Sequence, residues 1–221
     1  MGYNPEFPLM NKQQHTNRGQ NEEFNRVLYL VRHGSTNLNR ESGSGKDIIR
    51  GHIDVPLAES GRREAIAAAD RLERCGIQLI ATSDLSRAVE TAEIIAARSN
   101  AVVTAFYGLR PWKLGPAIEG HDYEEVLPRI RHFFQRPDET PQGGESFRHF
   151  KGRVFHTVAG IKVRGAYTKI AIVTHFRCIR LFESRKGRND VDTGRFFGDG
   201  GPPCSIRLLC RGKVRAFGDE E

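Results

Sequence analysis

The chain has 221 residues, enough for one substantial hydrophobic core. Hydrophobic residues make up 38% of it and charged residues 28%, a balance that argues against a membrane protein and against a wholly disordered chain. The 34 Lys and Arg against 27 Asp and Glu give a formal net charge of +7. Such an excess suits an anionic partner, whether nucleic acid, a phosphorylated small molecule or an acidic surface, and composition does not choose among them.

The start of the chain differs from the rest in composition. Residues 1–25 are polar and rich in Asn and Gln, which predicts a flexible N-terminal extension ahead of a single domain over 26–221. The first residues lack the basic and apolar segments of a secretory signal peptide, and no apolar stretch approaches the roughly 20 residues that span a bilayer. We therefore expect a cytoplasmic protein that has no membrane partner.

The cysteines show neither CxxC spacing nor the density of a disulfide scaffold. No His or Cys lies at zinc-ligand spacing around them, so we expect reduced thiols and no metal site. The four are Cys75, Cys178, Cys204 and Cys210.

Short apolar runs predict buried strands over 27–31, 79–82, 102–106 and 170–174. Near the C-terminus, the runs 205–209 and 214–217 are separated by Arg211-Gly212-Lys213, which is typical of a hairpin.

Helical patterns fall between these strands. Ser60 can cap a helix in which Ala65, Ala69 and Leu72 recur at helical spacing, and Cys75-Gly76 ends it. Further helices are predicted over about 86–98, 122–134, 145–163 and 177–185. Alternating strands and helices predict an α/β fold, a three-layer α/β/α sandwich with a mostly parallel sheet.

Basic residues follow three of the predicted strands. Arg32 and His33 end the first strand and precede Gly34, which lets the backbone approach a ligand closely. His175 ends the strand 170–174, and Arg87 lies near the start of the helix after 79–82. Because open α/β sheets place their ligands at the carboxyl ends of strands, these groups predict a site for a phosphoryl group.

With these residues the chain resembles the histidine phosphatase superfamily, which includes cofactor-dependent phosphoglycerate mutases and many phosphatases. The resemblance covers about 27–210 and implies the phosphoglycerate mutase-like version of the predicted fold. Its motifs are RHGSTNLN at 32–39, GHIDVPL at 51–57 with Gly61, SDLSRA at 83–88 with TAE at 91–93, GES at 144–146, and VTH at 173–175.

The resemblance implies a two-step phosphoryl transfer that needs no metal or other cofactor. His33 would attack phosphorus and form a phosphohistidine, which water then hydrolyses. Arg32 and Arg87 would clamp the phosphoryl oxygens, and His175 would donate to them as an imidazolium. Asn39 would complete the substrate-binding pocket through its amide.

The chain departs from the family where the general acid is usually found. The family pattern Leu-x-Glu-x-x-x-Gly corresponds here to 109–115, so Pro111 stands where the Glu would be. A general acid contributes about 10²–10⁴ in rate, so the chain needs another acid, good leaving groups, or works poorly. Glu119 is the favoured candidate because Glu119-Gly120 resembles the family's trailing Glu-Gly pair.

Other carboxylates compete with Glu119 for this role. Asp122 and Glu124 lie just downstream, although acidic residues at a helix start account for them equally well. Glu145 is a further alternative, but its place in the family pattern is closer to orienting an arginine of the site.

Two more departures lie near the predicted site. Arg177 follows His175 where the family usually has small residues, and it is either an extra phosphate ligand or a surface charge. The segment between Asn39 and Gly51 is longer than usual. It is either a basic loop that gathers a second anionic group or a tolerated surface insertion. Basic residues expected around the pocket are Arg40, Lys46, Arg50, Arg110 and Lys113.

The leading interpretation is a phosphatase acting on a small phosphomonoester or phosphohistidine. A mutase is the alternative within the family, although the short segment 115–143 favours hydrolysis. A degenerate phosphate-binding module is the alternative outside catalysis, and the missing acid supports it. Nucleic acid is not expected as a partner, since no basic stretch carries interleaved aromatics. The charge suggests a substrate with more negative charge than one phosphate.

Overall fold

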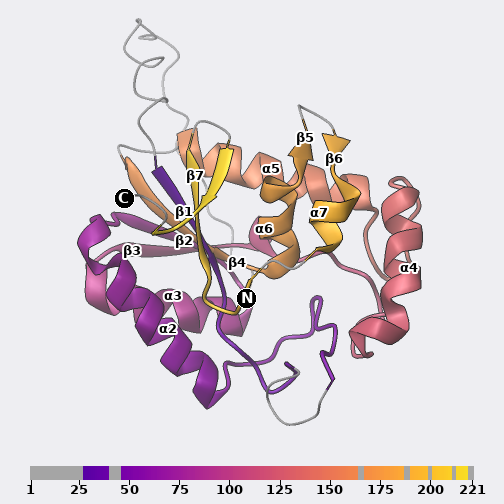
Figure 1. Ribbon diagram of the computed structural model, residues 1–221, viewed down its shortest axis with the longest axis horizontal. Helices are drawn as coiled ribbons and strands as arrows, with labels where there is room; N and C mark the ends of the chain where they lie inside the picture. The colour runs from indigo at the N-terminus through magenta and orange to yellow at the C-terminus, as the bar shows by residue number, and fades with distance from the viewer. Residues whose placement is uncertain are drawn as a thin grey trace, which may run out of the picture.

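The computed structural model describes residues 27–39, 46–163, 167–186, 190–198, 201–210 and 213–218 (Figure 1). The predicted extension over 1–25 lies outside the described residues. The strands are β1 (Val27–Arg32), β2 (Leu79–Ser83), β3 (Val102–Phe106), β4 (Lys169–Thr174), β5 (Arg185–Lys186), β6 (Asp190–Val191), β7 (Ile206–Cys210) and β8 (Lys213–Ala216). The α-helices are α2 (Glu59–Leu72), α3 (Ser86–Ser99), α4 (Tyr123–Gln135), α5 (Phe147–Val163), α6 (Phe176–Glu183) and α7 (Thr193–Phe197).

One six-stranded sheet organises the molecule, with the strand order β3-β2-β4-β1-β7-β8. The pairs β1–β4, β2–β4 and β2–β3 are parallel, whereas β7 runs antiparallel to β1 and β8 antiparallel to β7. The sheet is therefore mostly parallel, as predicted, and the terminal hairpin forms its antiparallel edge.

Helices cover both faces of the sheet (Figure 1). Along β1, Leu28 and Leu30 belong to a core cluster with residues of α4 to α7, while Tyr29 and Val31 belong to a second cluster with residues of α2 and α3. Successive side chains of a strand point to opposite faces, so each strand supplies both cores. The predicted three-layer α/β/α sandwich is confirmed.

Some element boundaries differ from the prediction. Helix α2 begins at Glu59 after Ala58, which makes no side-chain cap, so Ser60 does not cap it. Helix α5 begins at Phe147 rather than at 145. The β5–β6 hairpin and α7 were not predicted, because two-residue strands and a five-residue helix leave no periodicity to detect.

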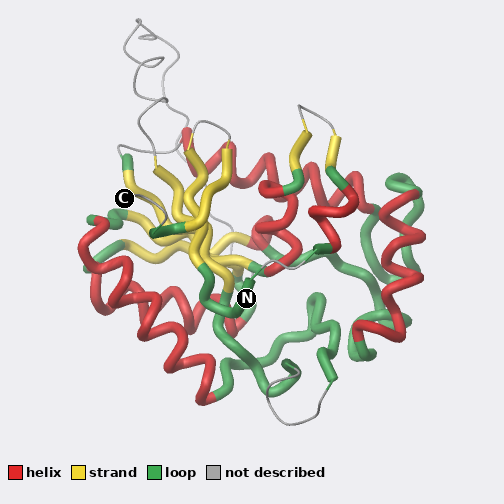
Figure 2. The backbone as a smooth tube through the Cα atoms, in the orientation of Figure 1, coloured by secondary structure: helices red, strands yellow, loops and turns green. Residues whose placement is uncertain are grey.

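The connection from β1 to α2 is mostly irregular where it is described. In Figure 2 it lies below the ends of the strands. All four cysteines lie in the described ranges and are free thiols. No helix of the described residues is long and apolar enough to cross a membrane.

Candidate active site

Two histidines meet where β1 and β4 end. The parallel register pairs Arg32 with Thr174, so the next residues, His33 and His175, leave the sheet at the same edge. Their ring centroids are 5.0 Å apart, and the residues are only 4% and 3% exposed. The sequence prediction that these histidines come together therefore agrees with the geometry.

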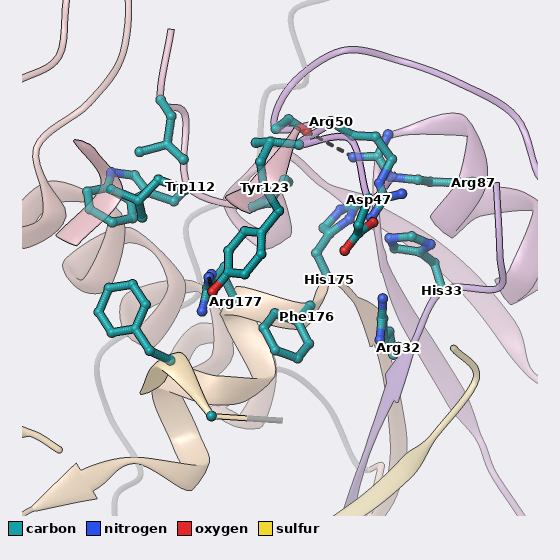
Figure 3. A pocket seen from close by; sticks show the side chains of 17 residues that line it. Arg32, His33, Asp47, Arg50, Arg87, Trp112, Tyr123, His175, Phe176 and Arg177 are labelled. Atoms are coloured by element: carbon teal, nitrogen blue, oxygen red, sulfur yellow. Dashed lines mark hydrogen bonds and ion pairs between the residues drawn. The ribbon is translucent and has the colours of Figure 1, made fainter. Parts of the chain in front are cut away.

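A cavity of about 380 Å³ opens beside the two rings (Figure 3). Its cationic half is formed by the histidines and by arginines from three parts of the chain. Its other half is mainly apolar and aromatic. The lining residues used below are Arg32, His33, Asp47, Arg50, Arg87, Pro111, Trp112, Leu114, Tyr123, Ile130, His175, Phe176, Arg177 and Phe197.

The loop after β1 packs tightly against the start of α2. A Cβ on Gly34 would lie 2.4 Å from the Gly61 carbonyl oxygen, so only glycine fits there. The Gly34 N–H donates to Thr91 Oγ1 at 3.1 Å, and the Ser35 N–H and hydroxyl donate to the Glu64 carboxylate, each at 2.7 Å. These contacts fix the backbone that carries His33.

The His33 ring is held in its neutral form. Its Nδ1 lies 2.7 Å from the Gly34 carbonyl oxygen, which can only accept, so Nδ1 carries the proton. Burial lowers the pKa of His33 well below its usual value, and Arg87, Arg50 and Arg32 lower it further. The ring is therefore neutral near pH 7, and its Nε2 keeps a free lone pair.

His175 is neutral for the same reasons. Burial, followed by Arg87 and His33, lowers the pKa of His175 well below its usual value. The expectation of an imidazolium is therefore not met by these surroundings. The Nε2 atom hydrogen-bonds to Ser83 Oγ at 2.8 Å, whereas the buried Nδ1 has no hydrogen-bond partner.

Arg87 is buried, and two backbone carbonyls hold the end of its guanidinium group. Its Nη1 and Nη2 donate to the carbonyls of Ile53 and Gly51, each at 2.9 Å, while Nε has no hydrogen-bond partner. Burial lowers the pKa of Arg87 to about 10, which still leaves it charged at neutral pH. Arg32 lines the same cavity and donates from Nη1 to the Gly201 carbonyl at 2.8 Å.

Arg50 adds a third guanidinium from the long loop. The sequence placed it on the rim, but its side chain is only 12% exposed and lines the cavity beside Arg87. Its Nη1 is 3.4 Å from Thr36 Oγ1, and its Nη2 is 3.6 Å from Asp47 Oδ1. Burial lowers the pKa of Arg50 to about 10. Of the other basic residues expected around the pocket, Arg110, Lys46 and Lys113 are not among the lining residues, and Arg110 pairs with Asp84. Arg40 is outside the described residues.

Two predicted site residues, Asn39 and Glu145, support the cavity instead of lining it. Asn39 Oδ1 accepts the Thr36 N–H at 2.9 Å, which stiffens the loop after His33. Glu145 accepts from Arg153 and from the Lys113 N–H. Arg153 also donates to carbonyls of the segment that carries Pro111. Glu145 thus supports this wall, in keeping with its interpretation as a residue that orients an arginine.

Glu119, the predicted acid, also lies outside the cavity lining. Its Oε1 accepts the Leu114 N–H at 2.8 Å, and its Oε2 accepts the His52 N–H at 3.1 Å. Both oxygens are therefore engaged in joining two loops. This placement does not favour Glu119 as a proton donor.

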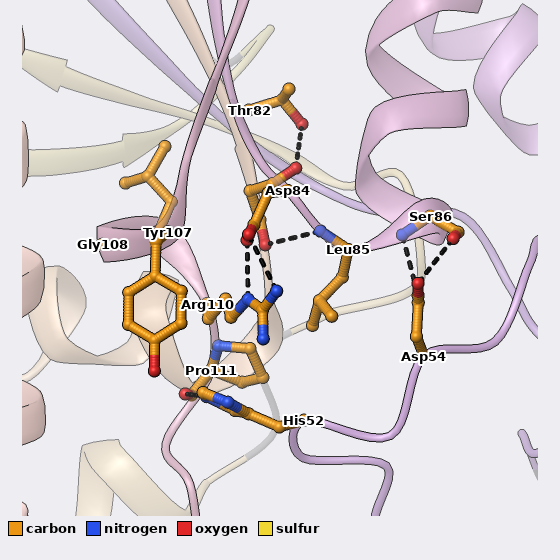
Figure 4. Close-up of polar contacts among 12 residues, drawn as sticks. His52, Asp54, Thr82, Asp84, Leu85, Ser86, Tyr107, Gly108, Arg110 and Pro111 are labelled. Atoms are coloured by element: carbon orange, nitrogen blue, oxygen red, sulfur yellow. Dashed lines mark hydrogen bonds and ion pairs between the residues drawn. The ribbon is translucent and has the colours of Figure 1, made fainter. Parts of the chain in front are cut away.

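The wall at Pro111 is held by polar contacts on its outer side (Figure 4). His52 Nε2 is 3.0 Å from the Pro111 carbonyl oxygen, and Arg110 forms two hydrogen bonds with Asp84. At the start of α3, Asp54 accepts from the Ser86 N–H and hydroxyl at 2.8 and 2.7 Å. Asp54 therefore occupies the first amide of α3.

Arg177 lies in the aromatic half of the cavity. Its Nη1 donates to the Phe196 carbonyl at 2.8 Å and its Nη2 to the Tyr123 hydroxyl at 3.2 Å. The guanidinium also lies within about 5 Å of the ring centroids of Phe176 and Phe197. Arg177 is therefore a buried organiser of the aromatic half, and the alternative of a plain surface charge is excluded.

The fold and this cavity define a class: an α/β protein with histidines and arginines gathered around one cavity at the strand ends. The sequence model of the histidine phosphatase superfamily (branch 1) matches residues 28–212. The chain belongs to this superfamily.

Individual relatives agree with that assignment. The chain is 35% identical over 166 residues to phosphoglycerate mutase-like protein 4 of Arabidopsis thaliana, covering 72% of this chain and 70% of the relative. Among solved structures, Bacillus stearothermophilus YhfR matches with a TM-score of 0.70 and 28% identity over 89% of this chain and 97% of its own. A protein titled mycobacterial hydrolase 1 matches with a TM-score of 0.68 and 26% identity over 87% and 96% of the two chains.

Proposed function

We propose that this protein is a phosphatase that hydrolyses a small phosphomonoester through a phosphohistidine on His33. In the first step, His33 Nε2 forms a bond to phosphorus while the bond from phosphorus to the alcohol oxygen breaks, and the alcohol leaves with a proton. In the second step, water attacks phosphorus, the N–P bond breaks, and inorganic phosphate leaves.

The observation that carries this proposal is the position of the His33 ring beside His175, in a cavity that three arginines also line (Figure 3). A nucleophile must be unprotonated, and the buried, arginine-flanked ring meets that condition. Charge spreads over the phosphoryl oxygens during transfer, and Arg32, Arg50 and Arg87 neutralise it. Once the substrate's negative charge is bound, it favours a proton on His175 Nδ1, which can then donate to a phosphoryl oxygen.

The other half of the cavity favours a phosphomonoester whose alcohol part is apolar or aromatic. Trp112, Leu114, Ile130 and Phe197 line it, and its one basic group, Arg177, already donates to Phe196 and Tyr123. A second phosphate on the substrate finds no available cation among these residues. We therefore favour a substrate with one phosphoryl group over the more highly charged one that the net charge suggested.

The test is formation and turnover of the phosphoenzyme. Wild type should hydrolyse p-nitrophenyl phosphate and carry acid-labile phosphate on His33 after rapid quenching. His33→Ala should lose both, with activity falling by at least about 10³-fold. His156→Ala, which changes an exposed histidine on α5, serves as the matched control.

Two other outcomes separate the alternatives. Phosphate trapped on His33 that passes to phosphoglycerate faster than to water would indicate a mutase, the activity for which the Arabidopsis relative is named. Phosphate binding without any phosphohistidine would indicate a degenerate binding module. Either result would contradict the proposed phosphatase.

A further inference from the structure

The proposed reaction needs a proton donor for the departing alcohol, and the usual position is occupied by Pro111. Proline has no ionisable group, and it forms part of the cavity wall. An alkoxide that leaves without a proton is slowed by about 10²–10⁴-fold relative to one that receives it. The donor must therefore come from another group that reaches the cavity.

Asp47 is the carboxylate that reaches it. Of the described residues that line the cavity, it is the only acidic one. Figure 3 shows its carboxylate pointing into the cavity on the side of His33 and His175. It comes from the segment between Asn39 and Gly51, which is longer than the family usually has.

The backbone around Asp47 is fixed by contacts with two other segments. The Asp47 carbonyl accepts the Tyr123 N–H at 2.8 Å, and the Ile49 N–H donates to the His121 carbonyl at 2.9 Å. The Ile48 N–H donates to the Leu38 carbonyl at 3.0 Å, and Ile48 forms a β-bridge with Asp122. These bonds place the Asp47 side chain at a defined point of the cavity wall.

The carboxylate of Asp47 is not consumed by structural hydrogen bonds. Its Oδ1 is buried without a hydrogen-bond partner and lies 3.6 Å from Arg50 Nη2. Among the other acidic candidates, Glu119 and Glu145 use both carboxylate oxygens to accept hydrogen bonds. Asp122 accepts the Glu124 N–H as the N-cap of α4, and neither Asp122 nor Glu124 lines the cavity. The side chain of Asp47 is 39% exposed, so it can exchange protons with solvent.

We propose that Asp47 is the general acid of the reaction on His33, an assignment that rests on the proposed function. As the P–O bond breaks, the proton of the Asp47 carboxyl passes to the alcohol oxygen, leaving a carboxylate. In the second step, that carboxylate takes a proton from the attacking water, which restores the acid. A bound phosphomonoester competes with Asp47 for Arg50, which frees the Asp47 carboxyl from its contact with that guanidinium.

The experiment compares leaving groups in the Asp47→Asn variant. The readout is kcat/KM, because it covers only the steps up to departure of the alcohol. We expect p-nitrophenyl phosphate, whose leaving group needs little protonation, to lose no more than about threefold, and phenyl-substituted alkyl phosphates to lose about 10²-fold or more. Asp47→Glu should recover part of the alkyl phosphate activity.

Controls separate this role from a structural one. Asp70→Asn changes an exposed aspartate on α2 that pairs with Arg98 at the surface, and it should leave both substrate classes unchanged. A loss in Asp47→Asn that is equal for all leaving groups would mean that Asp47 only positions Arg50, which overturns the assignment. Failure of wild type to form phosphohistidine would overturn the proposed function, and with it this one.

Discussion

The cavity that contains His33 can also be divided by the elements that carry its residues, into a strand-end half and a loop half. His33, His175 and Arg87 stand directly after β1 and β4 or at the start of α3 after β2, where the parallel sheet fixes their positions. Asp47 and Arg50 belong to an irregular segment, and a few backbone hydrogen bonds to 38 and 121–123 hold that segment in place. The strand-end half is therefore preorganised by the sheet, whereas the loop half depends on contacts between loops.

This difference assigns different chemistry to each half. A nucleophile and its phosphoryl clamp must sit within a fraction of an ångström of their reaction geometry, which rigid elements provide. The proton donor and the residues that contact the alcohol must match a particular substrate, and loops vary without disturbing the sheet. We infer that the strand-end half performs the transfer and that the loop half adapts it to one substrate class.

Replacing an arginine in each half is the sharpest test of this comparison. Arg87→Lys removes the planar fork that bonds two carbonyls while facing the cavity, so kcat/KM for p-nitrophenyl phosphate should fall about 10²–10³-fold. Arg50→Lys should lose about tenfold, because the Arg50 contacts of 3.4 and 3.6 Å indicate a looser placement. Arg98→Lys on the surface of α3 is the control. Equal losses at positions 87 and 50 would contradict the difference between the halves.

The strand-end half also predicts a strong sensitivity at Gly34. In Gly34→Ala, the new Cβ would meet the Gly61 carbonyl oxygen at 2.4 Å, and we expect a loss of roughly 1–3 kcal/mol in the free energy of unfolding. Urea denaturation measures it. Gly152→Ala is the matched control, since nothing lies within 4 Å of its Cβ position, and it should be neutral or slightly stabilising. A Gly34→Ala protein as stable as wild type would show that this loop is not rigid.

The strand-end half could be predicted from the sequence more completely than the loop half. The strands and the residues at their ends follow from apolar runs and from the geometry of parallel sheets, so His33, His175 and Arg87 could be placed together in advance. The prediction that the strand over 102–106 is buried was wrong, because β3 is the edge strand and Val102 is 55% exposed. Asn39, Glu119 and Glu145 carry the right chemistry in recognised motifs. A motif, however, does not show where its polar side chain points. The carboxylate or amide can line the cavity, or it can accept a hydrogen bond from a backbone N–H instead.

The loop half was not predictable in the same way. Asp47 reaches the cavity because the neighbouring Ile48 forms a β-bridge with Asp122. No local sequence pattern predicts a bridge between two irregular segments that are far apart in the chain. The aromatic half depends on α7, a helix too short to leave a periodic signal, which brings Phe197 to the wall. The excess of Arg and His around the site was a usable signal for Arg50, but only as a residue near the pocket.

The neutral histidines give a prediction on pH. The pKa values of His33 and His175 lie well below 6.5 because of burial and nearby arginines, while in the unfolded chain they return to about 6.5. Below pH 6.5 the unfolded chain therefore binds more protons, and the free energy of unfolding should fall with falling pH by up to about 1.4 kcal/mol per pH unit for each histidine. Urea denaturation of wild type and His175→Gln at pH 7 and pH 5.5 isolates the contribution of His175 to this pH dependence. Identical pH dependence in the two proteins would contradict it.

Activity should follow the same ionisation. Protonated His33 has no lone pair at Nε2, so kcat/KM should stay level as the pH falls through 6.5 and should decline only below it. A decline centred at or above pH 6.5, measured with p-nitrophenyl phosphate, would show that burial does not control this group.

The smallest effect is expected in the aromatic half, from Phe197→Leu. Leucine keeps much of the apolar volume but loses the flat ring that lines the cavity beside Arg177, so KM for aryl phosphates should rise by roughly threefold to tenfold while kcat changes little. Methyl phosphate, which has no group to reach this wall, should show no change in KM. The contrast matters because a change confined to KM marks binding of the alcohol, whereas the strand-end substitutions lower kcat/KM for every substrate. If Phe197→Leu lowered kcat for methyl phosphate as well, the aromatic half would take part in the transfer step. The assignment of transfer to the strand-end residues alone would then be wrong.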